Sequence, residues 1–79
     1  MKDMVELIAQ TICDKSDQVE VKEIPGTSSS IIEVSVAKED LGKMIGRQGK
    51  TAQSIRNIIY AASFKYNKRY TLEIMAHGE

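Results

Sequence analysis

The chain has 79 residues and an apolar fraction of 42%, which allows one domain with a modest core but not an enclosed catalytic cavity. A surface that binds something larger is therefore the better first expectation. The 11 basic and 11 acidic residues give a formal net charge of zero, which argues against indiscriminate binding to polyanions.

The first half of the sequence predicts one helix and two strands. Apolar residues recur at spacings of three and four at Met4, Leu7, Ile8 and Ile12. This spacing predicts an amphipathic helix over residues 2–15 with one buried face. Apolar and polar residues then alternate over 18–22 and over 31–36, on either side of the turn-forming stretch 25–30. These two segments predict half-buried strands that pair antiparallel.

The second half predicts two helices and a third strand. Leu41, Met44 and Ile45 fit a short helix, and a longer helix with apolar residues at helical spacing follows the glycines and extends to about Tyr66. Residues 70–75 alternate again, as a strand does. The order α-β-β-α-α-β predicts an α+β sandwich in which the helices pack on one face of a three-stranded sheet.

A glycine loop, Gly46-Arg47-Gln48-Gly49, joins the two helices. Glycine tolerates backbone angles that strain other residues, so one helix can end and the next begin within four residues. The missing side chains let a sugar-phosphate backbone approach, and the start of the next helix offers unpaired N–H groups and a positive dipole end. The alternative is a plain turn, because two glycines three apart occur in many unrelated chains.

Basic residues are concentrated around this loop. Residues 1–37 carry three basic and seven acidic side chains, residues 38–69 carry eight basic and two acidic, and residues 70–79 carry two acidic. Cations near the loop can follow several consecutive phosphates, although charged side chains on helices are often only solvated. The four candidates are Lys43, Arg47, Lys50 and Arg56.

The stretch from Leu41 to Lys50 resembles the I-G-x-x-G signature of the KH family, with Ile45 directly before the first glycine. The element order is also that of the type II KH fold, so the resemblance covers residues 1–79 as a single KH domain. More narrowly, the chain is similar to the small free-standing bacterial KH proteins of the KhpA type. This resemblance implies that the loop clamps about four unpaired nucleotides, whose bases lie in a groove between the helices and an adjacent strand.

The resemblance also assigns residues to this RNA site. Phosphates would be held by Gly46, Arg47, Gln48 and Gly49, with further charge from Lys43, Lys50 and Arg56. The resemblance also implies that Ile45 forms part of the groove floor, with Ile55, Ile32 and Val34 as weaker candidates. Simple core packing is nevertheless the favoured interpretation for each of these four aliphatic residues.

The resemblance implies a non-enzymatic RNA-binding protein that acts as a post-transcriptional regulator or RNA chaperone. Its partners would be single-stranded RNA, a second copy in a homodimer, and a larger KH-containing protein of the KhpB or Jag type. The process would touch cell-envelope growth and division, and therefore cell shape and cell wall biogenesis. The alternative is a protein-interaction or assembly module in which RNA binding is secondary.

Other residue patterns give no sign of an enzyme, a metal site or a cofactor. Cys13 is the only cysteine and is expected to be a small apolar filler, and His77 a solvated residue. Adjacent acids such as Glu39 and Asp40 fall at helix beginnings and ends, where capping and dipole effects explain them. The four aromatic residues could be stacking platforms, but core packing or a subunit contact is favoured at Tyr60, Phe64, Tyr66 and Tyr70.

The sequence also gives no indication of a membrane segment. It has no apolar run of about 18 residues that could span a bilayer. Residues 1–4 lack the basic and then apolar arrangement of a signal peptide. We therefore expect a cytoplasmic protein without membrane contact.

Overall fold

The computed structural model describes residues 1–77, and its elements follow the predicted order. The elements are α1 (Lys2–Ile12), η1 (Ser16–Gln18), β1 (Glu20–Pro25), β2 (Ser29–Val36), α2 (Lys38–Ile45), η2 (Arg47–Gly49), α3 (Lys50–Tyr66) and β3 (Arg69–Ala76). The two η elements are single 3-10 turns. Within the described part of the chain, no helix combines the length and apolar character needed to cross a membrane.

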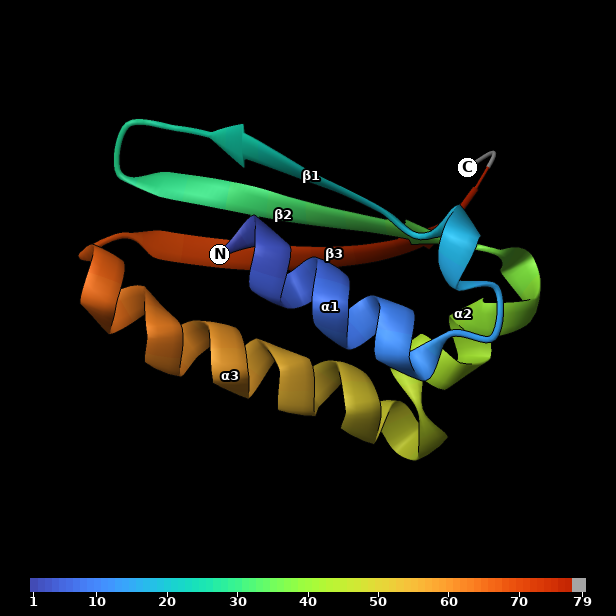
Figure 1. Cartoon of the computed structure of the whole chain (residues 1–79). Coiled ribbons are helices and arrows are strands. Elements are labelled where there is room, and N and C mark those ends of the chain that lie inside the picture. The colour runs from blue at the N-terminus through green and yellow to red at the C-terminus, as the bar shows by residue number, and fades with distance from the viewer. Residues whose placement is uncertain (78–79) are drawn as a thin grey trace.

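The three strands form one mixed sheet in the order β1-β2-β3. The first pair is antiparallel and the second is parallel, because the chain returns through α2 and α3 before it enters β3. Figure 1 shows α1 and α3 on the same face of the sheet, with α2 at one end. This arrangement confirms the predicted α+β architecture and matches the type II KH fold.

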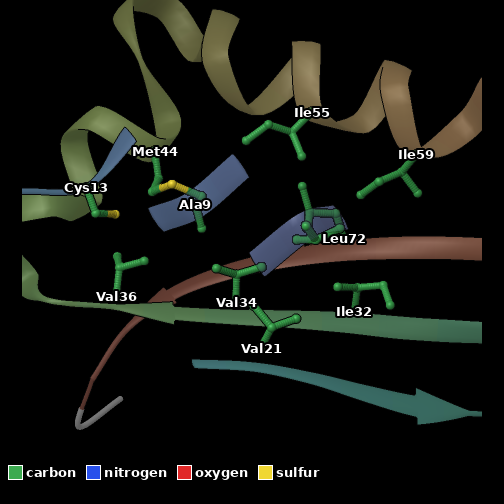
Figure 2. Close-up of a cluster of buried hydrophobic side chains, with 11 residues drawn as sticks. Ala9, Cys13, Val21, Ile32, Val34, Val36, Met44, Ile55, Ile59 and Leu72 are labelled. Carbon is green, nitrogen blue, oxygen red and sulfur yellow. The ribbon is translucent and has the colours of Figure 1, made fainter. Parts of the chain in front are cut away.

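The core lies between this sheet face and the helices (Figure 2). The strands contribute alternate residues that are almost fully buried, including Ile32, Val34 and Leu72. The helices contribute Met44 and Ile59, which are equally buried. Burial of such side chains is the main driving force for folding, at roughly 1.5–3 kcal/mol for each large aliphatic group.

The buried face of α1 overlaps the predicted one. Val5 and Ala9 are fully buried at its centre, and the predicted Met4, Ile8 and Ile12 pack partly buried against the same core. Of the four predicted residues only Leu7 is wrong, because it is 66% exposed. The spacing of three and four therefore indicated the helix and most of its face.

The predicted helix over residues 2–15 is too long, since α1 ends at Ile12 and Cys13 has extended backbone angles. The buried carboxylate of Asp40 accepts hydrogen bonds from the main-chain N–H groups of Asp14, at 3.1 Å, and Lys15, at 2.9 Å. Asp40 lies in the first turn of α2, which fits the expected dipole effect, but no side-chain capping bond forms there. The carboxylate instead fastens the chain after α1 to the first turn of α2. These bonds, the one from Lys15 first, hold the pKa of Asp40 below its usual range although burial opposes them.

Two ion pairs and one hydrogen bond surround this attachment. Lys15 pairs with Glu39, and Lys43 pairs with Asp14, so both pairs join the segment after α1 to α2. His77 is not the solvated residue that we expected, because its Nε2 atom contacts the main-chain oxygen of Gln18. Cys13 is buried as expected, and desolvation, with the nearby Asp40 charge second, raises the pKa of its thiol.

Asp40→Asn is expected to lower the urea midpoint of unfolding at pH 7, because it removes the charge that accepts both main-chain bonds. The stabilisation by Asp40 is present above the unfolded-state pKa of about 3.9 and is lost as the pH falls through the lower folded-state pKa. The difference between the wild type and Asp40→Asn should therefore shrink as the pH is lowered below about 4. Asp17→Asn, at an exposed position, is the matched control, and a pH-independent difference would contradict this account.

Candidate nucleic-acid interface

The glycine turn between α2 and α3 is built from an unusual backbone conformation. Gly46 has φ 77° and ψ 171°, Gln48 has φ 56°, and Gly49 has φ 75° and ψ 13°. The angles of Gly46 lie in a region that essentially only glycine occupies, whereas those of Gln48 and Gly49 are left-handed helical. The turn reverses the chain between two helices, and it leaves Arg47 and Gln48 exposed at its tip.

The two glycines have different surroundings. A Cβ atom at Gly46 would lie 2.7 Å from both the nitrogen and the Cβ of Thr51, and it would also overlap the Thr51 hydroxyl. At Gly49 a Cβ atom would meet nothing within 4 Å. Gly46 is therefore required for the fold of the turn, whereas Gly49 faces open space that a ligand can enter.

Main-chain donors are free at the tip of the turn. The N–H groups of Gly46 and Gly49 donate to Gly42 and Gly46, at 2.8 and 3.1 Å. Arg47 and Gln48 are the first two residues of η2, so their N–H groups have no acceptor within that turn, and outside the helices of residues 1–77 they make no main-chain hydrogen bond. No side chain caps the start of α3, and no acidic residue lies in its first turn. Unpaired N–H groups beside a positive helix end bind anions such as phosphate.

The four predicted cations are not equally available. Arg47 and Lys50 are exposed at the turn, and Arg56 is exposed on α3. Lys43 is held in the ion pair with Asp14, and the hydrogen bond of that pair is the main reason that the pKa of its ammonium group is raised. The structure therefore gathers three available cations near the turn and along α3, while Lys43 is partly neutralised by its partner.

A groove runs between α3 and the edge strand β3, along the middle of α3 and the first residues of β3. It is lined by Arg56 and Ile59 from α3 and by Tyr70, Thr71 and Leu72 from β3. Arg56, which the resemblance made a source of charge near the loop, lies on the wall of this groove six residues after Lys50. Exposed polar groups above an apolar floor suit a base with its phosphate.

Three of the four aliphatic candidates for the groove floor are core residues, which is the interpretation that the sequence favoured for them. Ile32, Val34 and Ile55 are at most 3% exposed. The strand order explains this for Ile32 and Val34, because β2 is central in the sheet and β3 is at the edge next to α3. Ile45 is 41% exposed at the end of α2, which contradicts its core interpretation and leaves it accessible beside the turn.

The sequence analysis missed the contribution of β3 to the groove. Tyr70 and Thr71 line the groove. Burial is the main reason that the pKa of the Tyr70 hydroxyl is raised, and the charge of Glu23 is the second reason. One available signal was the crossover from β2 to β3 through two helices, which favours a parallel strand next to β2. That rule places α3 over β3 and so identifies β3 as the wall of the groove.

The aromatic residues are mostly outside the core, contrary to the core-packing interpretation. Tyr60, Phe64 and Tyr66 are 58%, 73% and 55% exposed. Tyr60 and Phe64 stack with ring centroids 5.2 Å apart, and Tyr66 meets Tyr70 edge-on at 6.2 Å. The other half of that prediction, a subunit contact, stays a prediction.

The fold and the glycine turn together define a KH domain of type II. The family model for the KhpA/KhpB KH domain matches residues 2–74. The chain therefore belongs to the KhpA/KhpB KH-domain family. This is a family of RNA-binding KH proteins, which is not an enzyme class. Within residues 1–77, no group of three or more potential ligand side chains is arranged to hold a metal ion.

Several bacterial proteins are similar to this chain over almost its whole length. The RNA-binding protein KhpA of Clostridium perfringens is 45% identical and that of Clostridium acetobutylicum is 48% identical, both over 75 residues. The RNA-binding protein KhpA of Caldanaerobacter subterraneus subsp. tengcongensis is 49% identical over 75 residues. Each alignment covers 95% of this chain and 100% of the relative. No solved structure matches the chain.

Gly46→Ala is expected to reduce the free energy of unfolding more than Gly49→Ala. Both substitutions incur the cost of a positive φ, about 1–2 kcal/mol, but only Gly46→Ala also collides with the main chain of Thr51. Urea denaturation of both variants measures the difference. Gly42→Ala is the control, because Gly42 lies within α2 with open space around it, and alanine there should be neutral or stabilising by up to about 1 kcal/mol. Equal losses at Gly46 and Gly49 would contradict the structural role of Gly46.

Proposed function

We propose that this chain is a single KH domain that binds single-stranded RNA without enzymatic activity. The observation that carries the proposal is the turn at residues 46–49, where two unpaired main-chain N–H groups lie beside open space at Gly49. The similar KhpA proteins of the two Clostridium species are RNA-binding proteins, which supports the same ligand class.

The proposed mechanism is a clamp on the sugar-phosphate backbone. A phosphate enters the space next to Gly49 and accepts hydrogen bonds from the N–H groups of Arg47 and Gln48. The side chains of Arg47 and Lys50 neutralise its charge and that of the next phosphate. Because main-chain donors do not distinguish bases, this part of the site fixes the strand without reading its sequence.

The bases would then turn toward the groove between α3 and β3. Arg56 would contact a further phosphate along α3, and Ile45 would pack against a base close to the turn. We retain Lys43 as a member of the site, in a weaker role, because its ion pair with Asp14 already neutralises part of its charge. A single domain that contacts about four nucleotides has modest affinity that falls with salt.

Modest affinity favours the use of more than one domain, because linked sites bind the same strand more tightly. We propose a homodimer and an association with a larger KH protein of the KhpB or Jag type. Large apolar side chains at the surface support a protein contact, among them Leu7 at 66% and Ile58 at 45% exposure. We place the protein in the cytoplasm as a post-transcriptional regulator or RNA chaperone that affects cell shape and cell wall biogenesis.

The same exposed side chains favour a second candidate function, an assembly module in which RNA binding is secondary. Large exposed apolar groups are typical of protein contacts. An unused loop, however, would have no reason to keep Arg47 and Lys50 exposed next to free main-chain donors. We therefore place RNA binding first.

The double substitution Arg47→Asp/Gln48→Asp tests the proposal. Both side chains are exposed, and aspartate tolerates the positive φ of residue 48, so the fold should persist. Two negative charges against phosphate should lower the affinity for single-stranded RNA by at least tenfold, which corresponds to about 1.4 kcal/mol. Fluorescence anisotropy with a labelled oligoribonucleotide measures the loss.

The matched control is Lys2→Asp/Gln10→Asp on α1, which makes the same change in net charge at two exposed positions away from the turn. Circular dichroism of both double variants verifies the fold. An unchanged RNA affinity in the folded Arg47→Asp/Gln48→Asp protein would reject the clamp. An equal loss in the control would assign binding to overall charge instead.

A further inference from the structure

A larger hollow lies at the C-terminal end of α3 and adjoins the groove lined by Arg56 and Ile59. The two parts share Tyr70 and Thr71 from β3. The far part has a volume of about 870 Å³, which is within the range of small-ligand sites. Figure 1 shows that α3 runs from the glycine turn at its start to this opposite end of the molecule, where β3 begins.

The wall of this hollow exposes two aromatic rings. Tyr60 and Phe64 are stacked on each other at an interplanar angle of 30° and are 58% and 73% exposed. Phe64 is the only phenylalanine of the chain, and it contributes little to the core at this exposure. An exposed aromatic pair is a platform on which an unpaired base of any identity can stack.

The charge of the hollow suits a nucleic acid. Lys68 and Arg69 line it, and no described acidic residue does so. Outside this lining, the negative charge of Glu23 acts on the hydroxyl of Tyr70. A hollow that combines aromatic rings with cations and has no lining acid suits a nucleic-acid strand, whose bases stack and whose phosphates are negative. It suits an acidic or a purely apolar protein surface less well.

We propose that this end of the groove is a second subsite for the same RNA strand, in which a base stacks on Tyr60 and Phe64 and a phosphate contacts Lys68 and Arg69. The subsite rests on the proposed function, because the strand that reaches it is the one held at the glycine turn. Fourteen residues of α3 separate Lys50 from Phe64, which corresponds to about 21 Å along the helix. The subsite therefore lies beyond the stretch of about four nucleotides that a KH glycine loop clamps.

RNA length separates the two subsites experimentally. Competition binding with random-sequence oligoribonucleotides of about four and about twelve nucleotides compares the turn alone with the turn plus the far subsite. Phe64→Ala is expected to lower the affinity for the longer RNA by about fivefold or more and to leave the affinity for the shorter RNA unchanged. Phe64→Trp, which retains a stacking surface, is expected to retain the affinity for the longer RNA.

Ile24→Ala is the matched control, because Ile24 is an exposed apolar residue on β1, outside the groove. Equal affinity of wild type and Phe64→Ala for the longer RNA would overturn the proposal. If light scattering also showed a lower molar mass for Phe64→Ala, the patch would be a protein contact instead. The proposed function fails separately, if Arg47→Asp/Gln48→Asp retains its affinity for the shorter RNA.

Discussion

The constraint on which the rest of this structure depends is that α2 must end and α3 must begin within the four residues 46–49. Only a backbone with positive φ angles achieves this reversal, and Gly46 in particular has angles that other residues essentially do not adopt. The reversal has a chemical consequence. It removes the N–H groups of Arg47 and Gln48 from any main-chain partner among the described residues and presents them beside the start of a helix.

The rest of the fold holds this turn in place. Met44 anchors α2 and Ile55 anchors α3 in the same core, so the helices on both sides of the turn are fixed to the sheet. Asp40 fastens the first turn of α2 to the chain after α1 through two main-chain hydrogen bonds. A rigid frame matters here, because a turn that is already in its bound conformation loses little conformational freedom when a ligand binds.

The sequence predicted the elements well because each has a clear period or a glycine boundary. The long helix to Tyr66 and the strand at its end are confirmed, and the glycine turn lies between the two helices where it was expected. The errors share one physical cause, which is that periodicity does not reveal which neighbour covers a residue. Leu7 was placed on the buried face of its helix and Ile45 was expected in the core, but both are exposed. Phe64, expected in the core or in a subunit contact, is 73% exposed. The role of Asp40 depends on hydrogen bonds to Asp14 and Lys15, which precede it in the sequence by 26 and 25 positions. No local sequence pattern contains such a contact.

The account is tested most directly by amide chemical shifts recorded by NMR during titration with a short single-stranded oligoribonucleotide. A phosphate bound at the turn would change the shifts of the Arg47 and Gln48 amides first and most strongly, followed by those of α3 and β3 residues along the groove. Saturating shifts at these two amides are the expected result. Shifts that leave them unchanged and cluster on another surface would contradict the account.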